Sequence, residues 1–130
     1  MVQCILERKR LKNLTKIFLV VAMLFAGFAC TTDTTEDLGV GADDGVFKGE
    51  ICPVFYRKDA VEKLDGGTFW FSPTPDVPSK GWDAKYQRIC TWGLFRQKAT
   101  GKKVCFMNIH LDHIGQQARL ESAKQLVAYV

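Results

Sequence analysis

The sequence predicts a layered α/β (α+β) domain, and three observations support this fold class. Segments 89–95 and 103–109 are mostly apolar and flank the turn 99–102, which contains Gly101, as is typical of paired strands. Residues 116–130 then repeat apolar positions at helical spacing. Of the 130 residues, 47% are hydrophobic, which suffices for one folded domain and excludes an extended disordered chain.

The first 29 residues have the layout of an export signal, with a basic start, the apolar run 17–29 and small residues before Cys30. This run is short for a membrane-spanning helix, which needs about 20 residues. The Ala-Gly-Phe-Ala sequence before Cys30 resembles a bacterial lipoprotein signal, in which the cysteine is acylated. We therefore expect a lipidated, membrane-attached protein of the cell envelope. Plain export to the periplasm or medium and an uncleaved anchor are the alternatives.

The positive charge lies in the same segment. The formal net charge is +4, and residues 1–29 account for all of it, with five basic residues and one acidic residue. The rest of the chain is neutral, so no excess positive field remains to hold a polyanion. The sequence therefore argues against a general nucleic-acid-binding patch.

Residues 30–38 read as a polar linker, and the predicted domain follows from residue 39 to 130. Turn-forming residues fill 39–45, and residues 54–56 after Pro53 predict a short strand. A second strand is predicted at 68–71, introduced by a turn at Gly66-Gly67. The following loop, 72–87, contains three prolines that exclude a regular helix or central strand. Such a loop is either functional or a surface excursion held by Trp82.

The pair of strands at 89–95 and 103–109 leads into the helix. In the second strand, Cys105, Met107, Ile109 and Leu111 share one face, and the other face turns polar at Asn108 and His110. The helix after Gly115 is predicted to carry an apolar stripe made of Leu120, Ala123, Val127 and Val130.

The cysteines offer little chemistry. Cys52, Cys90 and Cys105 form no CxxC pair and no zinc-like cluster, so a structural metal site is not expected. Buried cysteines usually act as small apolar residues. If the chain is exported to an oxidising compartment, one disulfide can form, and the sequence does not show which two cysteines would pair.

Five linked motifs resemble the endonuclease/exonuclease/phosphatase family, and its exported bacterial branch in particular. They are VFYRKD (54–59), GTFW (67–70), TPDVPSKGWD (74–83), RICTW (88–92) and NIHLDH (108–113). The resemblance implies part of a four-layer sandwich of two mixed β-sheets flanked by helices, truncated at both ends. It also implies hydrolysis of phosphodiesters or phosphomonoesters with Mg²⁺ or a similar divalent ion.

The same resemblance implies the candidate site residues. His110 matches the family histidine that contacts the phosphate or helps to protonate the leaving group, a task that suits imidazole near neutral pH. Asn108 on the same strand face is expected to orient it. Arg88 either pairs with a phosphate oxygen or bridges strand and loop. The alternative without the family is that His110 is a satisfied polar residue at a strand end, and that Asp112 and His113 cap the turn before the helix.

Several family motifs are missing from the sequence. The metal-binding Asn and Glu and the later Asp-x-Asn and Asp-His are absent, and the branch's Gly-Arg-Asp-Asp-Gly reads Gly-Ala-Asp-Asp-Gly at 41–45. Because phosphoryl transfer relies on the metal ion, we expect little or no catalysis by this chain alone. The alternatives are a non-enzymatic surface lipoprotein or interaction module, and a half-domain complemented by another chain.

Overall fold

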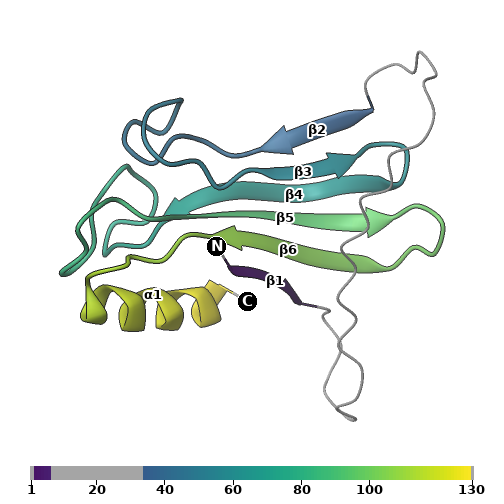
Figure 1. Cartoon of the computed structure of the whole chain (residues 1–130). Helices are drawn as coiled ribbons and strands as arrows, with labels where there is room; N and C mark the ends of the chain where they lie inside the picture. The colour runs from purple at the N-terminus through teal and green to yellow at the C-terminus, as the bar shows by residue number, and fades with distance from the viewer. Residues whose placement is uncertain (1, 7–33, 130) are drawn as a thin grey trace, which may run out of the picture.

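The computed structural model describes residues 2–6 and 34–129, which form six strands and one helix (Figure 1). The strands are β1 (Val2–Leu6), β2 (Thr35–Leu38), β3 (Val54–Arg57), β4 (Val61–Trp70), β5 (Ile89–Gln97) and β6 (Lys103–Ile109), and the helix is α1 (Gln116–Tyr129). The predicted α+β class is confirmed. Both sheets in this part of the chain are antiparallel, whereas the family resemblance implied mixed sheets.

The larger sheet has the strand order β1-β6-β5-β4. The predicted hairpin between β5 and β6 is confirmed, with Cys90 opposite Ile109 and Arg96 opposite Lys103. Gly101 in its turn has φ 70°, a conformation that glycine adopts without steric cost. Strand β1 covers the free edge of β6, with Val2 opposite Ile109 (Figure 1). The predicted signal, 1–29, therefore contributes one strand, and the rest of it, with Cys30, lies outside the described residues.

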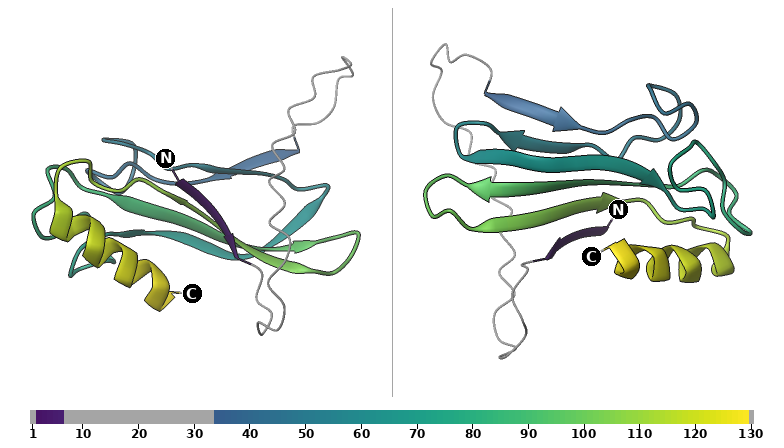
Figure 2. Two further views of the ribbon diagram at one scale, coloured as in Figure 1. Left: turned by 60° about the horizontal axis from the view of Figure 1, so that its bottom comes forward. Right: turned by 180° about the vertical axis from the view of Figure 1, so that it is seen from behind.

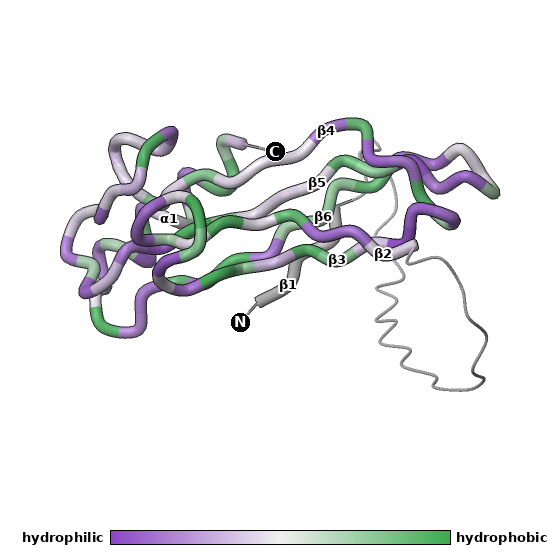
Figure 3. Tube along the Cα trace, turned by 90° about the horizontal axis from the view of Figure 1, so that it is seen from above, coloured by the Kyte–Doolittle hydropathy of each residue, from purple (hydrophilic) through white to green (hydrophobic). Residues whose placement is uncertain are grey.

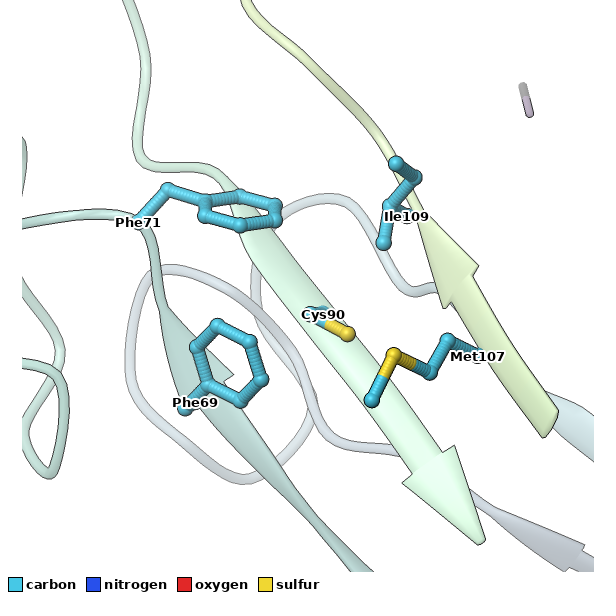
Figure 4. Close-up of a cluster of buried hydrophobic side chains, with 5 residues drawn as sticks. All are labelled: Phe69, Phe71, Cys90, Met107 and Ile109. Atoms are coloured by element: carbon cyan, nitrogen blue, oxygen red, sulfur yellow. The ribbon is translucent and has the colours of Figure 1, made fainter. Parts of the chain in front are cut away.

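The main core lies between this sheet and α1, which runs along one side of the sheet (Figure 2). Phe69, Phe71, Cys90, Met107 and Ile109 are buried there, and Figure 4 shows them converging from β4, the loop after it, β5 and β6. Leu126 of α1 packs against this cluster, and Tyr129 stacks on Phe69 with ring centroids 4.1 Å apart. The predicted apolar face of the last strand is thus confirmed. Burial raises the pKa of the Cys90 thiol to about 12.

The second sheet, β2 and β3, packs against the opposite face of the larger sheet. Trp70 and Ile89 on that face pack with Ala42 and Cys52, and the indole of Trp70 donates to the carbonyl oxygen of Ala42 at 2.7 Å. Hydrophilic residues concentrate in the connecting turns and loops (Figure 3). The helix, the larger sheet and the smaller sheet therefore form three layers. Burial raises the pKa of the Cys52 thiol to about 11.

Two segment predictions are wrong. The predicted linker 30–38 ends in strand β2, which pairs with β3. Gly66-Gly67 is not a turn, because β4 starts at Val61 and runs through both glycines. The sheet needs a residue without a side chain at Gly66, since a Cβ there would lie 2.9 Å from the carbonyl oxygen of Trp92. The predicted loop at 72–87 is confirmed as irregular structure.

The helix α1 is confirmed, but the predicted apolar stripe is not its packed side. Ala118 and Ser122 are its buried residues, whereas Leu120 is 57% exposed and Val127 is 77% exposed. Val130 lies outside the described residues. Much of the packed side is small or polar and gives little apolar signal, since Ala118 and Ser122 are buried there and Gln125 donates to the carbonyl oxygen of Trp70 at 3.1 Å. Its apolar members, Leu126 and Tyr129, lie near the end of the helix.

The N-terminus of α1 is capped by a residue from the loop between β4 and β5. The carboxylate of Asp83 accepts the backbone N–H groups of Gln117 and Ala118 at 3.3 and 2.6 Å. Gly115, the residue before the helix, has no side chain that could act as a cap, and the Asp83 carboxylate takes that role. A Cβ at Gly115 would lie 2.6 Å from Oδ1 of Asp83. No helix in the described part of the chain is long and apolar enough to cross a membrane.

Candidate functional site

Three segments bring polar side chains together at one end of the larger sheet. Arg88 directly precedes β5, and His110 directly follows β6. Because these strands are antiparallel neighbours, the start of β5 and the end of β6 meet at the same end. Glu50 reaches the same place from the loop before β3. The segment that follows His110 adds Asp112 and His113.

Arg88 is the centre of this cluster and only 3% exposed. Its Nε lies 3.2 Å from Oδ2 of Asp112, and its Nη1 forms an ion pair with Oε2 of Glu50. Two imidazoles complete its surroundings, with Nδ1 of His110 3.3 Å from Nη1 and Nδ1 of His113 3.1 Å from Nη2. The guanidinium is therefore directed at protein groups. The sequence left two roles for Arg88, pairing with a phosphate oxygen or bridging strand and loop. These contacts correspond to the second role.

Asp112 is fully buried and accepts hydrogen bonds at both carboxylate oxygens. Its Oδ1 accepts the N–H groups of Ile114 and Gly115 at 3.0 and 2.7 Å, and its Oδ2 accepts those of Lys85 and Tyr86 at 3.1 and 3.3 Å. Burial alone would raise the pKa of this carboxyl, but the four backbone donors outweigh burial and hold the pKa of Asp112 well below its ordinary value. Asp112 thus joins the loop before β5 to the turn before α1.

This depressed pKa predicts an acid-sensitive fold. Its contribution to the free energy of unfolding is fully present above the ordinary carboxyl pKa of about 3.9 and is lost as the pH falls below it. We expect the stability difference between the wild type and Asp112→Asn, measured by urea unfolding, to shrink between about pH 6 and about pH 3. Taking the difference removes the effect of other carboxyls such as Asp44. A stability difference that stays constant over this pH range would contradict the lowered pKa of Asp112.

His110 and Glu50 form an oriented pair. The Nδ1 of His110 lies 2.9 Å from Oε2 of Glu50, and both side chains are partly exposed. The Nδ1 also lies 3.3 Å from Nη1 of Arg88, but it cannot accept from that donor while it donates to Glu50. A carboxylate only accepts hydrogen bonds and gives the shorter contact, and Nη1 has Glu50 as its own acceptor. We therefore assign Nδ1–H of His110 as the donor to Glu50, which leaves Nε2 for proton exchange. Glu50 was not predicted from the sequence. It lies in an irregular loop far from His110 in sequence, so no strand or helix pattern connects the two residues.

Asn108, the remaining predicted site residue, contacts the chain before β3. Asn108 is buried, and its Nδ2 donates to the carbonyl oxygen of Pro53 at 2.8 Å. Its Oδ1 has no hydrogen-bond partner within residues 34–129. Asn108 therefore ties β6 to the chain before β3, and its predicted role in orienting His110 stays a prediction. The half-exposed ring of Tyr86 lies against this cluster, 5.5 Å from Cζ of Arg88.

A divalent ion does not fit the residues that the structure describes. Within 34–129, no group of three or more His, Cys, Asp and Glu side chains lies close enough to hold a metal ion. Glu50 faces Arg88 and His110, and both oxygens of Asp112 accept N–H donors. The unpartnered Oδ1 of Asn108 is a single oxygen, whereas magnesium takes six.

Comparison with solved structures identifies similar proteins. A mannosyl-6-phosphatase of Bacteroides thetaiotaomicron, Bt3783, is 50% identical with a TM-score of 0.71, and the match covers 75% of this chain and 36% of that chain. An endonuclease/exonuclease/phosphatase from Bacteroides vulgatus is 46% identical with a TM-score of 0.71, and the match covers 75% and 38% of the two chains.

Sequence comparison adds one relative. An uncharacterized protein of Acanthamoeba polyphaga mimivirus is 37% identical over 71 residues, which is 52% of this chain and 26% of that protein. No family model matches the chain. The chain spans little more than a third of the length of the similar solved structures.

Proposed function

Because three quarters of this chain belong in sequence and in fold to the endonuclease/exonuclease/phosphatase family, we propose that it carries part of a phosphate-ester hydrolase site. The pairing of Glu50 with His110 carries this proposal, because it leaves the second nitrogen of a partly exposed imidazole to exchange a proton. The 50% identity to a mannosyl-6-phosphatase makes phosphorylated hexoses the first substrates to test.

In the proposed reaction, His110 acts as the general acid. Water adds to phosphorus while the bond between phosphorus and the ester oxygen breaks, and one proton of that water passes to a phosphoryl oxygen. The Nε2 proton of His110 moves to that oxygen, which leaves as the alcohol. Glu50 accepts Nδ1–H and orients the ring, and Arg88 contacts both partners. Homologues in the family generally depend on a divalent metal ion. The described residues do not fit such an ion.

The test compares two leaving groups in the purified full chain. Mannose 6-phosphate has a poor leaving group that needs a proton, whereas p-nitrophenyl phosphate does not. We expect slow phosphate release from mannose 6-phosphate, about 100-fold slower in His110→Gln, and a much smaller effect for p-nitrophenyl phosphate. Magnesium should give little stimulation, because residues 34–129 hold no metal cluster.

Three outcomes would contradict this proposal. Equal release of phosphate by the wild type and His110→Gln would exclude His110 as the acid. No release from either protein would exclude catalysis by this chain alone and favour the second candidate. Strong stimulation by magnesium would contradict the expected weak activity and point to ligands outside the described residues.

The second candidate is a half-domain complemented by another chain. It is favoured by the outer side of α1, where Leu120 and Val127 are exposed at helical spacing. The partner would supply an apolar surface for this stripe and the missing metal ligands. Co-purification from the native envelope would identify it, and Leu120→Lys with Val127→Lys should abolish the association. Association that survives both changes would exclude this surface.

We also propose that the protein is exported and anchored by an acylated Cys30, in which case cleavage before Cys30 removes β1 and leaves the edge of β6 unpaired by it. The support is the sequence pattern of residues 1–30 alone.

A further inference from the structure

His113, the second histidine of the cluster, is held in place by contacts that the proposed proton transfer does not use. Its Nδ1 lies 3.1 Å from Nη2 of Arg88, and its ring stacks on Tyr86 with centroids 6.0 Å apart. A guanidinium has only N–H donors, so Nδ1 of His113 must accept in this contact. The proton of the neutral ring therefore lies on Nε2.

The two histidines consequently hold opposite tautomers. His110 carries its proton on Nδ1, which faces the Glu50 carboxylate, and His113 carries its proton on Nε2. The Nδ1 of His113 faces the buried Arg88, and His113 itself is exposed, so the edge with Nε2 is the one toward solvent. One histidine offers a nitrogen for proton transfer, and the other offers a fixed N–H donor.

A phosphate ester bound beside these histidines would need an N–H donor such as that of His113 for its negatively charged oxygens. Arg88 carries one positive charge, and it already faces the carboxylates of Asp112 and Glu50. Its side chain is 3% exposed, so it offers little to a ligand from solvent. Of the two imidazoles beside it, His113 is the one whose N–H does not face Glu50. Lys85 adds a cation beside Tyr86, 5.2 Å from the ring centroid.

We propose that His113 is a substrate-binding residue that donates its Nε2–H to a phosphoryl oxygen of the ester bound at His110. This inference rests on the proposed function and deepens it. It assigns the two histidines different tasks, with His110 serving the leaving oxygen and His113 the oxygens that stay on phosphorus.

The first test reads both histidines directly in the unmodified chain. The sequence contains only two histidines, so imidazole ¹⁵N spectra of the full chain hold two ring systems, and His110→Gln assigns them. We expect an Nε2–H tautomer for His113 and an Nδ1–H tautomer for His110. Titration with inorganic phosphate should shift the signals of both rings along one saturating curve.

The second test uses a matched pair of variants. His113→Gln places an amide N–H donor near the position of Nε2, and His113→Phe keeps a ring against Tyr86 without a donor. We expect His113→Phe to weaken phosphate binding at least about tenfold, as for loss of a hydrogen bond to a charged group. His113→Gln should stay within about threefold of the wild type.

The outcomes separate this inference from the proposed function. A response of His110 alone to phosphate, an Nδ1–H tautomer of His113, or equal binding by His113→Phe and the wild type would overturn the role of His113 and leave the His110 site standing. No response of either ring would overturn both proposals. Rescue by His113→Gln would support the donor role, because the amide lacks the imidazole ring and shares only its N–H.

Discussion

Replacing Arg88 with methionine is expected to lower the free energy of unfolding by about 3–5 kcal/mol, the range for breaking a buried ion pair. The change leaves the buried Asp112 carboxylate without its cation, and it removes the group that Glu50, His110 and His113 share. Arg88→Lys should recover only part of the loss, because an ammonium cannot reproduce the planar fork of donors. Urea unfolding of the full chain measures both changes.

The matched control is Arg96→Met on β5. Arg96 forms an ion pair with Glu62 at 3.0 Å, but the two side chains are 42% and 50% exposed. Exposed pairs contribute little because water screens both charges, so we expect a loss of about 0.5 kcal/mol or less. Equal losses for the Arg88 and Arg96 variants would show that the cluster around Arg88 does not stabilise the fold.

Phe69→Ala is expected to cost about 3–5 kcal/mol, as for other large-to-small changes in a core. Phe69 is 2% exposed, meets Phe71 edge to face at 5.4 Å and stacks on Tyr129 of α1. Its removal leaves a cavity between β4 and α1 and loosens the end of the helix. The loss should appear as a lower urea midpoint.

Phe47→Ala is the control for this change. Phe47 is 83% exposed in the loop before β3, so its truncation should alter the stability by no more than about 0.5 kcal/mol. If Phe47→Ala cost as much as Phe69→Ala, the cluster shown in Figure 4 would not be the main core.

The sequence predicted the hairpin of β5 and β6 and the core side of β6, because alternating residues and a glycine turn are local signals. It misassigned the packed side of α1, since Ala118, Ser122 and Gln125 carry little apolar signal. It also started β4 too late, because two glycines in sequence resemble a turn unless the neighbouring strand is known.

The candidate site was predicted from family motifs at the level of single residues. His110 and Arg88 do lie together, but their shared partner Glu50 was missed. A contact between two loops depends on how both sheets pack, and no periodic pattern within either loop records it. The deep burial of Arg88 likewise follows from the placement of Asp112 and Glu50 around it, which local sequence does not specify.

The reciprocal capping by Asp83 and Asp112 has a consequence for local motion. Asp83 in the loop before β5 accepts N–H groups of the first turn of α1, while Asp112 before α1 accepts N–H groups of the loop. Neither segment can detach without stripping the other of its acceptors. The amide hydrogens of Lys85, Tyr86, Gln117 and Ala118 should therefore exchange with solvent as one cooperative unit. The loop beside Arg88 would detach only when the start of the helix frays with it.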